Sequence, residues 1–111
     1  MTQRIEKINE LIKQEVGKLI LKEADISRDV LVTVIKADTS PDLRSSAIYI
    51  TVLPEIKEQE ILRELEFKTF DIQQELNKKI RVKFVPKIEF KIDKQAHAEQ
   101  RIYEIMEREE Q

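Results

Sequence analysis

Basic side chains gather in one stretch of this sequence. Residues 68–94 contain eight basic side chains against four acidic ones, a net charge of +4, whereas the whole chain carries −2. Lysine and arginine neutralise phosphate groups, and such contacts supply most of the sequence-independent affinity of proteins for nucleic acids. The stretch therefore predicts a surface for an RNA backbone, with the candidate contacts Lys68, Lys78, Lys79, Arg81, Lys83 and Lys87.

The same charges have a structural explanation. Cations in the last turn of a helix complement the helix dipole, and charged residues along an edge strand protect a sheet from aggregation. The segments 55–66 and 95–111 each carry a net charge of −3, so charge of both signs is zoned along the chain. On charge alone both explanations stay open.

No residue set typical of catalysis or of metal binding occurs in the sequence. The absence of cysteine excludes disulfides and thiolate metal sites. His97 is the only histidine, and with Asp93 and Glu99 it makes a poor ligand set, so we expect it to face solvent on a helix. A single glycine excludes phosphate-binding loops and nucleophile elbows. We therefore expect a protein that is not an enzyme and has no cofactor or metal.

Hydrophobic periodicity predicts the elements that position the basic residues. Apolar side chains that recur every three or four positions predict amphipathic helices, and strict alternation predicts half-buried strands. The expected elements are a helix over residues 2–23, a hairpin of strands at 30–36 and 47–53 ended by Pro54, a helix from about 62 to 79, an edge strand over 80–93 that continues across Pro86, and a last helix over 95–111 capped by Asp93.

The alternation also predicts which side chains are buried. The core faces are expected to be Ile48, Ile50 and Val52 in one strand, and Ile80, Val82, Phe84, Ile88, Phe90 and Ile92 in the other. This parity leaves Arg81 and Lys83 in solvent. It also removes most aromatic rings from the surface, so we expect recognition of RNA shape and phosphate rather than of bases.

Two positions in the helices are unusual. Gly17, the only glycine, falls inside the first helix, which favours close packing against a neighbouring element over a bend. Phe67 and Phe70 lie off the apolar stripe of the second long helix, which predicts a kink or a break there.

The order of elements predicts one α+β domain over residues 1–111. The strand–helix–strand unit makes its two strands parallel, so the three-stranded sheet should be mixed, with helices on one face. The first residues lack the apolar region of a signal peptide, and no apolar run is long enough to span a bilayer, so no membrane partner is expected.

Three stretches of the sequence resemble the ribosome-binding factor A family of bacterial ribosome assembly factors. They are the opening helix with Arg4, Ile5 and Ile8, the segment VTVIKADTSPDLRSSAIYITVLP, and the segment IRVKFVPKIEFKID with the helix that follows it. The family usually has an alanine-any-glycine triplet at the kink of its central helix, where this chain has Lys68, Thr69 and Phe70. The small residues of that triplet are missing here.

The resemblance implies a KH-like domain of the type II topology. It further implies a cytoplasmic, monomeric factor that binds the small ribosomal subunit through 16S-type rRNA, free rather than in whole ribosomes, and assists late maturation of the subunit and processing of its rRNA. In the loop before the second strand, Asp42 is expected to fix the backbone, Leu43 to fill the edge of the core and Arg44 to reach RNA. The alternative is a protein-binding or dimerising module without RNA contact.

Overall fold

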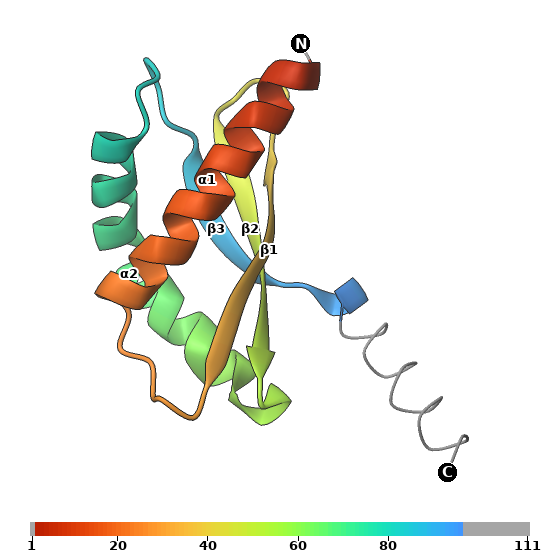
Figure 1. The fold of residues 1–111 in the computed structure, drawn as a ribbon, viewed down its shortest axis with the longest axis vertical. Coiled ribbons are helices and arrows are strands. Elements are labelled where there is room, and N and C mark those ends of the chain that lie inside the picture. The colour runs from red at the N-terminus through yellow and green to blue at the C-terminus, as the bar shows by residue number, and fades with distance from the viewer. Residues whose placement is uncertain (1, 97–111) are drawn as a thin grey trace.

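Two long helices lie against one face of a three-stranded sheet in the computed structural model, which describes residues 2–96 (Figure 1). The elements are, in chain order, α1 (Thr2–Glu23), β1 (Leu31–Thr39), β2 (Ser45–Leu53), the short 3-10 helix η1 (Glu55–Lys57), α2 (Glu58–Lys79) and β3 (Lys87–Ile92). The predicted α+β class and the order of these elements are confirmed.

Strand β2 is the centre of the sheet. It pairs with β1 in antiparallel orientation and with β3 in parallel orientation, which confirms the predicted mixed sheet. Ile48, Ile50 and Val52 are buried, as their parity predicted, because they point toward the helices. The hairpin ends at Leu53, directly before Pro54.

Strand β1 continues to Thr39, past its predicted end at residue 36, and contains a bulge that hides this continuation in the sequence. The pairing with β2 shifts register between Val34 and Lys36, so Ile35 is an extra residue in β1. Beyond the bulge the inward parity changes, and Ala37 and Thr39 are buried. Alternation in the sequence breaks at this point, and the predicted strand therefore stopped at residue 36.

Helix α1 has the predicted bounds. Its three- and four-residue spacing predicted one apolar face, of which Ile5 is half-buried and the others are buried, namely Ile8, Ile12, Val16, Leu19 and Ile20. The prediction of close packing at Gly17 is wrong, because a Cβ atom at this position would have nothing within 4 Å. Gly17 therefore brings a conformational cost without a packing benefit.

Helix α2 is one continuous helix that changes direction near its middle. In Figure 1 its first half runs obliquely below the sheet, and its second half runs beside α1 in another direction. In the middle of α2, the Thr69 hydroxyl donates a 2.7 Å hydrogen bond to the carbonyl of Leu65, a kind of contact that competes with the helical ladder and bends helices. The predicted kink is confirmed, without a break into two helices.

The predicted strand over residues 80–86 is wrong. Ile80 is buried, but it caps α2 through a 3.0 Å hydrogen bond from its N–H to the carbonyl of Leu76, four residues before it. Its apolar character thus belongs to the helical stripe and not to an alternating strand. The next four residues are exposed, including the predicted core residues Val82 and Phe84, and β3 begins only at Lys87, after the buried Pro86.

Asp93 caps a helical turn as predicted. Its Oδ1 accepts hydrogen bonds from the N–H groups of Gln95 and Ala96, at 3.0 and 3.1 Å. The remainder of the helix expected over residues 95–111, with His97, lies outside the described residues.

The open space at Gly17 generates a prediction. Gly17→Ala should raise the free energy of unfolding by about 0.5–1 kcal/mol, since alanine restricts the unfolded chain and has helical φ and ψ available without a clash. Urea denaturation followed by circular dichroism measures the change. Val16→Ala at the neighbouring buried position is the control and should lower the free energy of unfolding. A destabilised Gly17→Ala variant would contradict this interpretation.

Candidate nucleic-acid interface

Three segments that are distant in the sequence meet at one end of the molecule. They are the first turns of α1, the loop between β1 and β2, and the loop between α2 and β3, which lie together at the top of Figure 1. Between them is a hollow of about 710 Å³. Its charged lining residues are Arg4, Asp42, Arg44, Lys83 and Lys87, which are four cations and one anion.

The loop between β1 and β2 is held by its own polar groups. The Ser40 hydroxyl donates a 2.6 Å hydrogen bond to Asp42 Oδ1, and the backbone N–H of Arg44 donates to the same oxygen at 3.1 Å. These two hydrogen bonds keep the pKa of the Asp42 carboxyl below its usual value. The carboxylate therefore stays ionised at neutral pH, and the predicted role of Asp42 in fixing the backbone is confirmed.

Leu43 has the left-handed backbone conformation that glycine usually occupies, with φ of 62°. Its side chain is half-buried and packs against the core, as predicted. This packing offsets the local cost of a positive φ and explains why a leucine occupies the position. The turn holds the neighbouring Arg44 at the surface, where it is exposed.

A backbone hydrogen bond joins the two loops directly. The N–H of Lys87 donates to the carbonyl of Arg44 at 3.0 Å. The next residue, Ser45, is the first residue of β2, and its pairing with Lys87 begins the parallel ladder of β2 and β3. The side chains of Arg44 and Lys87 are therefore presented from adjacent backbone positions.

Gln73 attaches the loop before β3 to helix α2. Its Oε1 accepts a 2.9 Å hydrogen bond from the N–H of Ile88, and its Nε2 donates to the carbonyl of Pro86 at 3.1 Å. One side-chain amide thus pairs with both backbone groups that flank Lys87. This contact fixes the point at which the basic loop enters the sheet.

Helix α1 is fastened to the same end of the sheet. Asn9 Oδ1 accepts a 2.9 Å hydrogen bond from the N–H of Thr39, the last residue of β1, and the buried hydroxyls of Thr39 and Ser46 lie 3.2 Å apart. Asn9 follows Ile8, which lines the hollow. The hydrogen bond between Thr39 and Asn9 therefore helps to fix where the first turns of α1, with Arg4, lie relative to the two loops.

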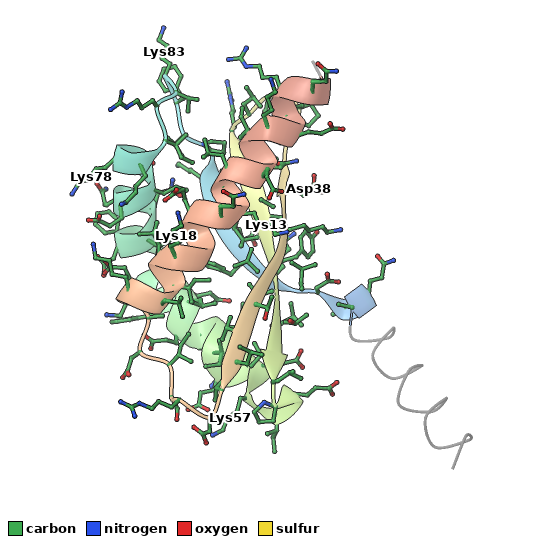
Figure 2. The ribbon with its side chains drawn as sticks, viewed as in Figure 1. Lys13, Lys18, Asp38, Lys57, Lys78 and Lys83 are labelled. Atoms are coloured by element: carbon green, nitrogen blue, oxygen red, sulfur yellow. The ribbon has the colours of Figure 1, made fainter. Side chains whose placement is uncertain are left out.

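Three of the seven predicted basic residues line the hollow. Arg44, Lys83 and Lys87 line the hollow, Arg81 is exposed in the same loop as Lys83, and Lys78 and Lys79 are exposed in the last turn of α2. Figure 2 shows Lys83 at the tip of the loop and Lys78 on the outer side of α2.

Lys78 and Lys68 differ from the other predicted RNA contacts in their surroundings. Lys78 Nζ lies 3.4 Å from Glu75 Oε1, so part of its charge is compensated within the helix. Lys68 lies ten residues before Lys78, roughly 15 Å earlier along α2, and its ammonium is near the ring of Phe67. Lys68 does not line the hollow.

Two residues of this surface were not predicted from the sequence. Arg4 lies in the first turns of an amphipathic helix, and nothing in the sequence indicates that this end of the helix faces the two loops. Phe84 was predicted in the core and is 76% exposed. The signal that could have found it is the helical spacing of Leu76 and Ile80, which removes Ile80 from the alternating pattern.

Metal ligands do not cluster in the described part of the chain. Within residues 2–96, no group of three or more His, Cys, Asp or Glu side chains is placed to hold a metal ion. None of the helices in this part of the chain is long and apolar enough to cross a bilayer.

Helices on one face of a mixed three-stranded sheet, in the order α-β-β-α-β with a bent central helix, define a KH-like domain of the type II topology. The crystal structure of ribosome-binding factor A from Thermus thermophilus has the same fold, with a TM-score of 0.69 over 79% of this chain and 93% of that one at 20% identity.

Sequence comparison gives the family. The family model described as Ribosome-binding factor A matches residues 4–106. A ribosome-binding factor A of Natranaerobius thermophilus is 36% identical over 91 residues, which cover 81% of this chain and 70% of that protein, and one of Opitutus terrae is 27% identical over 108 residues, which cover 96% and 88%. The chain belongs to the ribosome-binding factor A family, which is not a known enzyme family.

The contacts of Gln73 generate a prediction. Gln73→Leu should lower the free energy of unfolding by about 1–3 kcal/mol, because it leaves the N–H of Ile88 and the carbonyl of Pro86 without their partner. Hydrogen exchange measured by NMR should show a faster rate at the Ile88 amide. The exposed neighbour Gln74 provides the control, since Gln74→Leu should leave this rate unchanged. Equal exchange rates at Ile88 in both variants would contradict a role of Gln73 in holding the loop.

Proposed function

We propose that this protein is a ribosome assembly factor that binds the small ribosomal subunit through its 16S-type rRNA. It acts as a single cytoplasmic, monomeric domain on free subunits rather than on whole ribosomes, and assists late maturation of the subunit and processing of its rRNA. Membership of the ribosome-binding factor A family supports ribosome binding. One structural observation supports RNA as the contact: four cations from three separate segments surround one hollow.

The geometry of these cations suits a phosphate backbone. Arg4, Arg44, Lys83 and Lys87 come from a helix, two loops and the start of a strand, and their main-chain positions are held by hydrogen bonds of Asn9, Asp42 and Gln73. A pre-positioned set of cations loses less conformational entropy on binding than cations on a disordered segment. Phosphates that follow one another along RNA can then bind several of these side chains at once.

The opposite end of the molecule has a different charge. A second hollow there is lined by Asp25, Asp29, Glu60 and Glu64 against Lys57 and Arg63. Figure 2 shows Lys57 at the end of the molecule that lies farthest from Lys83. An RNA surface repels this acidic end and attracts the basic end, so the charge distribution supports one orientation of docking.

Charge reversal at the basic end generates a prediction. Lys83→Glu combined with Lys87→Glu should weaken binding to purified small subunits and reduce the slope of log K against log salt by about 2, since each lost phosphate contact removes about one unit. Co-sedimentation between about 50 and 200 mM salt measures both quantities. Both lysines are exposed, so the fold should be retained.

The matched control is Lys18→Glu combined with Lys57→Glu, away from the hollow. The Lys18 side chain is 74% exposed and pairs with Glu15 at 3.7 Å, and the Lys57 side chain is 44% exposed and pairs with Glu60 at 3.3 Å. Ion pairs of such accessible lysines contribute little, so their loss should cost little stability. Both double variants have the same net charge, and only the first should lose affinity. Equal affinities would contradict the proposed contact surface, and salt-insensitive binding by the unmodified protein would favour the protein-binding alternative.

A further inference from the structure

Phe84 is a large aromatic side chain that the fold leaves in solvent. Its side chain is 76% exposed at the tip of the loop between α2 and β3, and Val82 in the same loop is 37% exposed. Both line the hollow together with the apolar side chains of Ile8 and Leu43. The hollow therefore combines an apolar floor and an aromatic ring with a cationic rim.

The cations around Phe84 are near enough to act with it. The ammonium of Lys83 lies 5.7 Å from the centre of the Phe84 ring, and Arg4, Arg44 and Lys87 line the same hollow. Among the described residues of the lining Asp42 is the only anion, and its carboxylate is already hydrogen-bonded to the Ser40 hydroxyl and the Arg44 N–H. The field in the hollow thus favours an anionic ligand with a flat apolar part.

Phe67 on helix α2 provides an internal comparison. Its exposure is 79% and the ammonium of Lys68 lies 5.8 Å from its ring centre, so its solvent access and its distance to a neighbouring lysine match those of Phe84. Its wider surroundings are the acidic hollow with Asp25, Glu60 and Glu64. An exposed ring next to a lysine is therefore common to both places, and the cationic rim is particular to Phe84.

We propose that Phe84 stacks against an unpaired base of RNA while Arg4, Arg44, Lys83 and Lys87 bind the phosphates on either side of it. An aromatic ring stacks on any base, because every base has a π face, and such stacking accompanies phosphate contacts in proteins that bind single strands. A volume of about 710 Å³ lies in the range of sites for small organic molecules, so the hollow is large enough for a single nucleotide. The ligand is a single-stranded segment, because the bases of a duplex are covered by their neighbours.

This inference rests on the proposed RNA-binding function and adds to it. The phosphate contacts alone would serve a duplex and a single strand similarly. Stacking on Phe84 makes an accessible base a requirement for full affinity, so the protein distinguishes RNA in which this segment is unpaired from RNA in which it is paired.

A tryptophan reporter tests the stacking directly. The chain contains no tryptophan and two tyrosines, so Phe84→Trp introduces a single tryptophan into the hollow, whose fluorescence can be excited selectively. A single-stranded RNA oligonucleotide should quench its fluorescence, whereas the same strand annealed to its complement should not. Phe67→Trp is the matched control and should be unaffected by either RNA. Equal quenching of the Phe84→Trp protein by single strand and duplex, or no quenching by the single strand, would overturn the proposal.

An affinity measurement separates this proposal from the function on which it rests. Phe84→Leu keeps an apolar side chain and all four cations but removes the stacking surface, and should weaken binding to a single-stranded oligonucleotide by about 5-fold to 100-fold. The slope of log K against log salt should stay unchanged, since no phosphate contact is lost. Phe67→Leu should have the affinity of the unmodified protein.

Each outcome distinguishes the stacking proposal from the RNA-binding function on which it rests. If Phe84→Leu binds RNA as tightly as the unmodified protein, with the same salt slope, the stacking proposal is wrong and RNA binding stands. If the unmodified protein binds neither RNA nor subunits at low salt, both proposals fail. If Phe84→Leu loses affinity for a ribosomal protein and keeps its affinity for RNA, the hollow is a protein-binding site and the stacking proposal is again wrong.

Discussion

The parallel pairing of β3 with β2 is the constraint on which the basic end of this molecule depends. Parallel strands begin at the same edge of a sheet, and here Ser45 pairs with Lys87 at the first position of both strands. The loops that precede these strands must therefore lie side by side, although residues 45–79 separate them in the sequence. Helix α2 makes the crossover that this pairing requires, and the loop that follows it arrives next to the loop before β2.

The elements that could be predicted from the sequence are those with a single clear period. Helix α1 and the inward face of β2 are as the sequence predicted, since a buried stripe or an alternating face has few alternative placements. The stretch after α2 was predicted wrongly as a strand because a helical period and a strand period overlap there. Ile80 completes the helical series of Ile72 and Leu76, and it also stands two positions before Val82, as a strand residue would. Local sequence does not decide between these series, and the burial of Ile80 under the helix does.

The sequence predicted that the candidate site is basic, but it did not predict every residue that forms the site. Runs of lysine and arginine near the end of a helix are visible in the sequence and predicted Lys83 and Lys87, whereas Arg44 was predicted from the resemblance to the family. Arg4 joins them because the buried face of α1 and the hydrogen bond from Thr39 to Asn9 fix how α1 lies on the sheet. Phe84 joins them because its segment is a loop. Lys68, in contrast, is close to the basic cluster in sequence and distant along α2. Tertiary contacts of this kind carry no local signature in one sequence.

The bulge at Ile35 has a consequence beyond the register of the sheet. In the described part of the chain β1 is an outer strand, with backbone groups along one side that no other strand pairs. The bulge divides this strand into two short straight runs, Leu31–Val34 and Lys36–Thr39, that do not lie in one continuous line. A strand from another molecule could pair with one run without continuing smoothly along the other, and Lys36 places a charge where the second run begins. The irregularity that lets Ala37 and Thr39 reach the core thus also protects the chain against edge-to-edge aggregation while it is free of its partner.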